Sequence, residues 1–503
     1  TKGKTINDLL KHNNSFVYFA SMQDLRGSDK VGGNFDKNDD IFKTDWDFVV
    51  VDEAHEGTKT ELGKNVLQAV IKEEKNDTHK TYVLELSGTP FNLLTDFEQE
   101  SIYTWDYIME QEAKTTWDKY HFGDSNPYEE LPRMNIFTYH LEKSLPVYID
   151  VMDKAFNFRE FFRLWTGDIK KDGKPVPKGI SKGSFVHEQD IKSFLDLICK
   201  KDESTNYPFS TSEYRGFFRH SLWVVPGVKE AKALSSLLKN HHIFKHFSIV
   251  NVAGDGDEEI DTSDALKAVK NAMTENPDTT YTITLSCGRL TTGVSVPEWT
   301  AVLMLAGTYS TAASQYLQTI FRVQTPANIN GKIKEDCFVF DFAPDRTLKM
   351  VAESVQLSAR AGANNAVAEV ALGKFLNFCP VISIDESNMK EYKVAELLQE
   401  LKKAYAERVA RNGFDDPKIY NDELLKLTKV ELEEFEGLRK IVGESKQTKK
   451  TGEIDINKEG FNDQESEEEK KLKEKKKKES LTEEEKARLA ELKEKRKNRR
   501  HFA

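Results

Sequence analysis

Two adjacent carboxylates close a short apolar run near the start of the chain. The run Val49-Val50-Val51 leads into Asp52-Glu53-Ala54-His55. Hydrolysis of a nucleoside triphosphate needs one carboxylate to hold the magnesium shell and a second to orient and deprotonate the attacking water. Asp52 and Glu53 have the side-chain types for these two roles. The alternative interpretation is a solvated turn after a strand, but this four-residue string rarely follows a strand by chance.

A parallel sheet would position these carboxylates, because ligands bind at the carboxyl edge of open α/β sheets. Three apolar runs in the first part of the chain indicate buried strands: Phe16–Ala20, Phe48–Val51 and Tyr82–Leu86. A second set with the same alternation of strands and helices begins after residue 220. It comprises Ser221–Val225, Phe247–Val252, Tyr281–Leu285, Ala301–Leu305 and Cys337–Phe342, with helical stretches at Val228–Leu238 and Ser263–Met273. The sequence therefore predicts an α/β protein with two lobes, each built on a parallel sheet.

The patterns divide the chain into five parts. Residues 1–100 are the C-terminal part of a first lobe, 101–219 an aromatic-rich, irregular insertion, 220–345 the second lobe, 346–445 a helical region and 446–503 a charged helical tail. Apolar residues at three- and four-residue spacing predict helices at Tyr392–Val409 and Asp422–Ile441. The tail carries an N-cap signature at Thr482 with Glu485 three positions on, so we expect solvated helices there.

Composition limits the class of protein. The chain has 503 residues, a formal net charge of −11 and 38% hydrophobic residues, which is enough to fill the cores of about three domains. No apolar stretch approaches the roughly 20 residues of a membrane-spanning helix, and the N-terminus lacks a signal-peptide pattern. The four cysteines have no CxxC spacing, which argues against a zinc knuckle or a disulfide framework. We expect a soluble, cytoplasmic protein with no membrane partner.

The acidic string resembles the Walker B box (DEAH box) of superfamily 2 helicases and DNA translocases. Four other segments follow the order of motifs in that superfamily: Ala20–Leu25 resembles motif Ib, Ser87–Pro90 motif III, Thr291–Pro297 motif V and Gln318–Arg322 motif VI. Each segment alone is a weak signal, but their collinearity across two α/β lobes is specific. Within the superfamily, the sequence is most similar to the motors of type I and type ISP restriction enzymes. The segments that carry this similarity are Trp46–His55, Ser87–Asn92, Gln318–Pro326 and Phe340–Phe342. The resemblance covers about residues 15–400 and implies two RecA-like lobes, the first incomplete.

The resemblance implies ATP and Mg²⁺ as cofactors. Asp52 would hold Mg²⁺ through water, Glu53 would act on the attacking water, and Arg322 would stabilise charge on the transferred phosphoryl group. His55 and Gln318 would pass the nucleotide state across the cleft.

Further residues would couple the ATP site to DNA. The coupling residues implied by the resemblance are Ser87, Thr89 and Gly293, and the residues that would hold DNA phosphates by neutral hydrogen bonds are Ser21, Gln23, Thr291 and Thr292. Neutral contacts to the DNA backbone carry no sequence information, and a translocase needs that kind of contact.

The chain departs from the family pattern in two places. Motif VI has Phe321 where the family has glycine and Thr325 where it has a second arginine. The Gly-rich phosphate loop that the family places roughly a hundred residues before Walker B is missing. Gly3-Lys4-Thr5 spells the end of such a loop, but no apolar strand precedes it. We therefore expect a chain that begins inside the first lobe and is inactive alone, which agrees with a first residue, Thr1, that is not Met.

The function implied is an ATP-dependent motor of a restriction-modification enzyme. It would hydrolyse ATP to move on double-stranded DNA, with a nuclease and with methyltransferase or specificity parts in the same or a partner chain. One alternative is another superfamily 2 helicase that serves repair or remodelling. A second alternative is a non-hydrolysing nucleic-acid-binding module, which the missing phosphate loop and Thr325 favour.

Overall fold

The computed structural model describes residues 6–11, 15–54, 61–72, 80–88, 97–141, 145–148, 156–167, 179–201, 207–254, 262–291, 293–307, 313–359, 365–385 and 388–400. They belong to one compact unit, Thr1–Phe435. The predicted tail and the helix expected at Asp422–Ile441 lie outside the described residues, and of Tyr392–Val409 residues 394–400 are described as helical.

The helices alternate with strands along most of the described chain. The helices are α1 (Ile6–Leu10), α2 (Met22–Arg26), α3 (Asp39–Lys43), α4 (Glu61–Val70), α5 (Tyr107–Tyr120), α6 (Phe158–Phe161), α8 (Glu188–Ile198), α9 (Ser212–Phe217), α10 (Val228–Asn240), α11 (Thr262–Met273), α12 (Ala313–Ile320), α13 (Pro344–Ala359) and α14 (Asn365–Phe378). The strands are β1 (Phe48–Val51), β2 (Tyr82–Glu85), β3 (Arg133–Tyr139), β4 (His220–Val224), β5 (Ser248–Asn251), β6 (Thr282–Ser286), β7 (Ala301–Met304), β8 (Asn328–Ile329), β9 (Lys332–Ile333), β10 (Asp336–Asp341), β11 (Val381–Asp385) and β12 (Asn388–Glu391).

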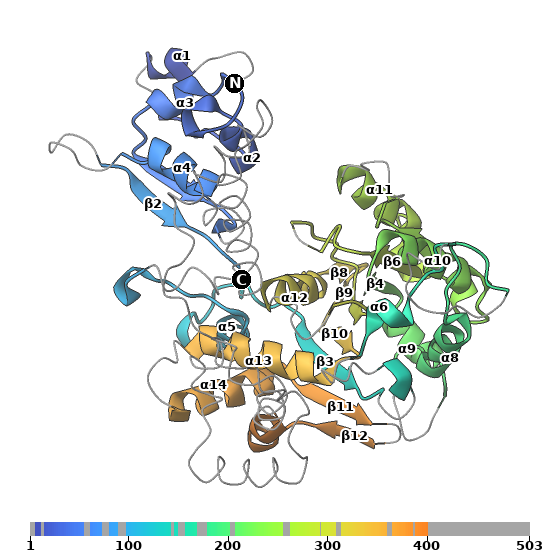
Figure 1. Cartoon of the computed structure of the whole chain (residues 1–503). Coiled ribbons are helices and arrows are strands. Elements are labelled where there is room, and N and C mark those ends of the chain that lie inside the picture. The colour runs from blue at the N-terminus through green and yellow to red at the C-terminus, as the bar shows by residue number, and fades with distance from the viewer. Residues whose placement is uncertain are drawn as a thin grey trace, which may run out of the picture. The chain divides into compact units, whose positions relative to one another are not determined.

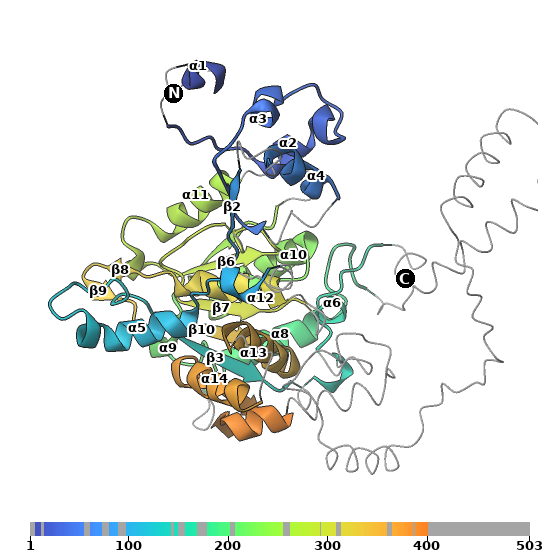
Figure 2. The ribbon, with the colours of Figure 1, turned by 90° about the vertical axis from the view of Figure 1, so that its left-hand side faces the viewer.

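An eight-stranded sheet forms the larger body. Its order is β12-β11-β3-β10-β7-β4-β6-β5, and every neighbouring pair is parallel except β11 with β12. In Figure 2 the labels β6, β7, β10 and β3 follow one another down the picture in this order. Strands β4, β6 and β7 are almost wholly buried, as expected for apolar runs in a sheet covered on both faces. The predicted fold class, α/β with parallel RecA-like sheets, is confirmed.

The two faces of this sheet support separate hydrophobic clusters. Neighbouring residues point to opposite faces, so Val302 of β7 joins one cluster and Leu303 joins the other. Helices α5, α11, α12, α13 and α14 contribute to the first cluster, and α6, α8 and α10 contribute to the second. Figure 1 shows α13 and α14 on one side of the strands and α8 and α10 on the other.

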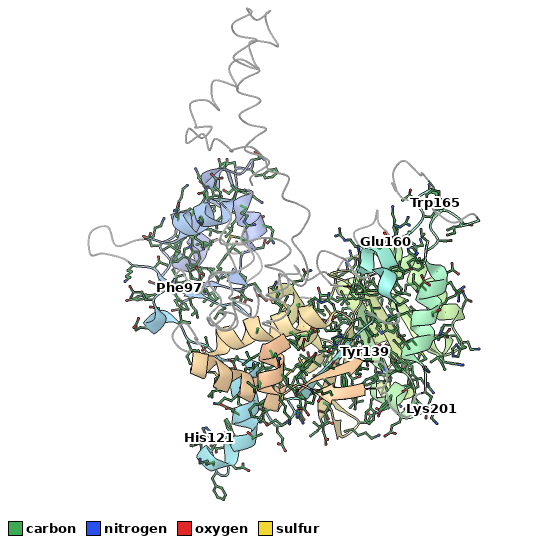
Figure 3. All side chains as sticks on the ribbon, turned by 60° about the horizontal axis from the view of Figure 1, so that its bottom comes forward. Phe97, His121, Tyr139, Glu160, Trp165 and Lys201 are labelled. Atoms are coloured by element: carbon green, nitrogen blue, oxygen red, sulfur yellow. The ribbon has the colours of Figure 1, made fainter. Side chains whose placement is uncertain are left out.

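Three of the eight strands, β3, β11 and β12, come from segments where the sequence patterns gave none. Strand β3 lies between β11 and β10 although the sequence marks residues 101–219 as an irregular insertion, and β11 and β12 fall in the region expected to be helical. Tyr139, at the end of β3, is 2% exposed and lies among the densely packed side chains of Figure 3. The sequence pattern of β3 is a weak indication of a strand, because polar and apolar residues are mixed in it. Its neighbours in the sheet are about 200 residues away in sequence.

A separate two-stranded sheet holds the N-terminal motifs. Strands β1 and β2 pair in parallel with Val51 opposite Glu85. Buried residues of α2, α3 and α4 form a small cluster beside Val49, including Val66 and Val70, which are four residues apart on one face of α4. Phe48 and Tyr82 remain 54% and 65% exposed. The expectation that both strands are buried is therefore wrong in this respect, because helices pack beside part of the sheet and leave much of its apolar surface open.

The strand expected at Phe16–Ala20 is absent from the structure. Residues 15–20 belong to no helix or strand, and Val17 and Phe19 are 80% and 91% exposed. An apolar run becomes a strand only where a neighbouring strand forms hydrogen bonds with its backbone, and no described residue pairs with this run in a sheet.

Among the described residues, no helix is long and apolar enough to cross a membrane.

Candidate functional site

The acidic pair lies directly after β1, at the carboxyl end of the small sheet. Asp52 and Glu53 are both exposed, and the Glu53 backbone N–H donates to Asp52 Oδ1 at 2.9 Å. Glu53 has a φ of 47°, in the left-handed region that costs a non-glycine residue on the order of 1 kcal/mol. Ala54 is 1% exposed, and its N–H donates to the Leu86 carbonyl at 3.0 Å. The backbone thus anchors a strained turn that presents both carboxylates to solvent.

Ser87 leaves the sheet at the same edge as the acidic pair. The Leu86 N–H donates to the Val51 carbonyl at 2.8 Å, which extends the pairing of β1 and β2 beyond the strand ends. Ser87 is half-buried and Gly88 is exposed. The structure therefore brings the predicted Walker B and motif III segments together. His55 and Thr89 lie outside the described residues.

The predicted motif Ib residues lie on the short helix α2. Ser21 is the N-cap of α2, where its Oγ accepts from the Asp24 N–H at 3.1 Å. Gln23 is exposed, and Leu25 is buried in the cluster shared with α4. Since the Ser21 oxygen is the acceptor in the cap, its hydroxyl hydrogen stays available to donate to another group.

The predicted motif V residues form the loop after β6. Thr291 is 3% exposed, and its hydroxyl donates to the Gly288 carbonyl at 2.6 Å. Gly293 is exposed with a φ of 67°, a conformation that glycine adopts without strain. Thr292 lies outside the described residues. The Thr291 hydroxyl hydrogen is committed within the loop, so this side chain holds the loop in shape.

Arg322 ties this loop to the helix of motif VI. Its Nε donates to the Gln318 carbonyl at 3.0 Å, and its Nη1 donates to the Val294 carbonyl at 2.8 Å. Gln318, in the last turns of α12, is 8% exposed. Burial lowers the pKa of the Arg322 guanidinium, and the Glu53 carboxylate acts in the opposite direction. The predicted motif V and VI residues are thus joined, and Glu53 of the predicted Walker B segment is close enough to favour the charged form of Arg322.

One basic side chain at the carboxyl edge of the eight-stranded sheet was not predicted from the sequence. Arg289 lies in the loop after β6, and its Nη1 donates to the Val252 carbonyl after β5 at 3.3 Å. Its guanidinium covers Gly254, where a Cβ would come within 3.5 Å of Nη1 and where φ is +98°. Arg289 is the only basic residue between Cys287 and Pro297, which is a signal that the sequence contained.

The donor set at the acidic pair fits a magnesium ion. Mg²⁺ takes oxygen ligands, usually one or two carboxylates completed by water and substrate phosphates. Asp52 and Glu53 supply exposed carboxylates of this kind.

The described residues also contain two clusters of side chains that could bind a metal ion, and neither belongs to the predicted motifs. One cluster is Asp196, His241 and His242, and the other is Asp29, Asp36 and Asp39.

The two parallel sheets and the placement of the predicted motifs resemble those of helicase-like proteins of superfamily 2. Sequence comparisons bear this out, because residues 1–92 match the family of the type III restriction enzyme res subunit. The chain is also 28% identical to a putative type II restriction enzyme and methyltransferase of Mycoplasma pneumoniae, RM.MpnORF110P C-terminus. That match covers 69% of this chain and 53% of the relative. The resemblance to a superfamily 2 helicase-like motor of restriction enzymes is therefore confirmed, in a chain that spans about half the length of this relative.

Solved structures give weaker similarities. The ATP-dependent type ISP restriction-modification enzyme LlaBIII bound to DNA is 12% identical, with a TM-score of 0.37, over 74% of this chain and 24% of that one. The SWI2/SNF2 ATPase core of Sulfolobus solfataricus in complex with double-stranded DNA is 13% identical, with a TM-score of 0.21, over 70% and 72%. The Dbp5 protein of S. cerevisiae bound to RNA and ADP BeF3 is 11% identical, with a TM-score of 0.28, over 71% and 63%.

Proposed function

We propose that this chain provides the ATP-hydrolysing motor of a restriction enzyme and that the motor moves along double-stranded DNA. The observation that carries the proposal is the exposed acidic pair in a strained turn after β1. A strained residue is retained where the surrounding structure and a function require it, and two carboxylates at the carboxyl end of a parallel strand suit nucleotide hydrolysis.

The acidic pair would divide the chemistry. Asp52 would hold Mg²⁺, which would supply charge neutralisation on the phosphates when bound. Glu53 would orient the attacking water and accept its proton. The left-handed conformation of Glu53 turns the chain directly after Asp52, so the two carboxylates can take different tasks.

Arg322 would stabilise the negative charge that develops on the transferred phosphoryl group. Two of its N–H groups are donated to the carbonyls of Gln318 and Val294, which fixes the planar guanidinium. An arginine has five N–H donors, so donors remain for a phosphate. Because Val294 belongs to the loop after β6, a change at Arg322 would be transmitted to that loop, with Gly293 as the point where the backbone can turn.

The DNA contacts would come from both sheets. Ser21 keeps a hydroxyl hydrogen that can donate to a phosphate, and Gln23 offers an exposed amide. Thr291 would shape the motif V loop, and Thr292 would provide the neutral contact there. Ser87 and Thr89 would couple these contacts to the acidic pair. The relative in Mycoplasma pneumoniae, named as a restriction enzyme and methyltransferase, suggests nuclease and methyltransferase partners in the same or an associated chain.

The test is the Glu53→Gln variant of the native full-length protein. DNA-stimulated ATP hydrolysis should fall by about 10²- to 10⁴-fold, because a general base is lost, while the Kd values for ATP and DNA stay close to wild type. Glu61→Gln, a change of an exposed glutamate on α4, is the matched control and should leave hydrolysis unchanged. Near-normal hydrolysis by Glu53→Gln would remove Glu53 from the mechanism. ATP binding without hydrolysis in the wild type would favour a non-hydrolysing binding module.

A further inference from the structure

A wholly buried ion pair lies at the carboxyl edge of the eight-stranded sheet. Asp341 is the last residue of β10 and Arg346 is in the first turn of α13, and both side chains are 0% exposed. Arg346 Nη2 donates to Asp341 Oδ1, and Nε donates to Oδ2 at 3.1 Å. The Ala343 N–H and the Thr347 hydroxyl also donate to this carboxylate, each at 2.9 Å. Asp341 therefore orients the guanidinium and is itself fully hydrogen-bonded.

The rest of the Arg346 guanidinium reaches two segments of the proposed motor. It donates to the carbonyls of Ala306 and, at 3.3 Å, Met304, where β7 ends. Its Cζ lies 5.7 Å from the ring centroid of Tyr316 on α12. The chain runs from β7 into α12, so one side chain fixes both ends of that connection.

Helix α12 leads into the 3-10 turn Phe321–Gln324, which carries the arginine of the proposed ATP site. Tyr316 is 1% exposed and precedes Gln318 by two residues, and the Gln318 carbonyl accepts from Arg322 Nε at 3.0 Å. A contact that fixes Tyr316 therefore fixes the end of α12, whose Gln318 carbonyl holds the Arg322 side chain from the 3-10 turn that follows.

A contribution to stability does not by itself explain why a buried ion pair occupies this position. Replacing a buried ion pair by apolar residues of similar volume is often neutral or stabilising, because the desolvation of both charges offsets their attraction. The planar fork of arginine instead supplies directional hydrogen bonds. Here they join β10, the end of β7 and, through the ring contact, α12, which favours a role in geometry.

We propose that Arg346, oriented by Asp341, is a positioning residue that sets α12 so that Arg322 can act on the phosphates. This inference rests on the proposed ATP-hydrolysing function. The effect is on the chemical step, because a displacement of about 1 Å at a reacting group costs about 100-fold in rate.

The test compares three variants of the native full-length protein. Asp341→Leu/Arg346→Met removes both charges together, and in the folded double variant kcat for DNA-stimulated ATP hydrolysis should fall about 100-fold while KM for ATP changes less than about threefold. Tyr316→Leu should lower kcat in the same selective way, and Tyr316→Phe, which keeps the ring, should stay near wild type.

His220→Gln is the matched control. His220 is also buried in a hydrogen-bonded set, with Thr282 Oγ1 and the Pro277 carbonyl, but at the amino end of β4. Its kcat should match wild type. A folded double variant with wild-type kcat would overturn the inference, and if the double variant does not fold, wild-type kcat in Tyr316→Leu would do so. A wild type that binds DNA and ATP but hydrolyses none would instead overturn the proposed function, and the positioning role with it.

Discussion

At the residue scale, the site depends on how backbone geometry presents two acids. Glu53 adopts a left-handed conformation, and the bonds from Ala54 and Leu86 on either side hold that turn against the sheet. Asp52 accepts the Glu53 N–H, so the first acid stabilises the turn that displays the second. The acid pair and Arg322 were predictable because their types and order are written in the sequence. The carbonyl partners of Arg322 were not, since main-chain acceptors leave no trace in residue type.

The strain at Glu53 gives a stability prediction. Asn tolerates φ > 0 and a β-branched residue does not, so Glu53→Val should be less stable than Glu53→Asn by about 1–2 kcal/mol. Both variants lose the same carboxylate, which makes them a matched pair, and urea unfolding measures the difference. Equal unfolding midpoints would mean that position 53 does not hold the left-handed conformation.

At the element scale, the strands of the larger sheet were predicted to within one or two residues where they are continuous apolar runs. Strands β4, β6 and β7 are central and parallel, so both of their faces are buried, and apolar residues together with small buried polar residues fill them. Strand β3 was missed because it alternates and pairs with distant segments. Phe16–Ala20 was wrong because an apolar run alone does not provide a partner strand. The Asp341–Arg346 pair was beyond reach, because tertiary packing brings Arg346 to the end of β7.

A buried histidine at the start of β4 gives a pH prediction. Burial lowers the pKa of His220 below its ordinary 6.5. Above that pH both states are neutral. At pH values below 6.5, His220 is protonated in the unfolded chain but stays neutral in the folded chain. The free energy of unfolding therefore decreases as the pH falls, until the pH is below the lower pKa of the folded state. As the pH falls from above 6.5 to below it, His220→Gln should therefore lose less unfolding free energy than wild type. Parallel pH profiles for the two proteins would contradict this.

At the scale of the whole molecule, distant segments combine into one motor-like unit. The eight-stranded sheet takes strands from Arg133 to Glu391, and the motifs after β6 and α12 meet through Arg322. The acidic pair and Ser87 leave the small sheet at its carboxyl edge. A net charge of −11 does not oppose the proposed DNA binding, because contact with a backbone requires only local donors such as the exposed amide of Gln23.

Displacement of a third strand from linear double-stranded DNA by the native full-length protein tests the central claim most directly. A motor that moves along DNA should displace the third strand only with ATP and Mg²⁺, after a lag that lengthens with the distance between its loading site and the triplex. Glu53→Gln should bind the same DNA and displace nothing. Displacement without ATP, or ATP hydrolysis with no displacement at any distance, would contradict ATP-driven movement along DNA.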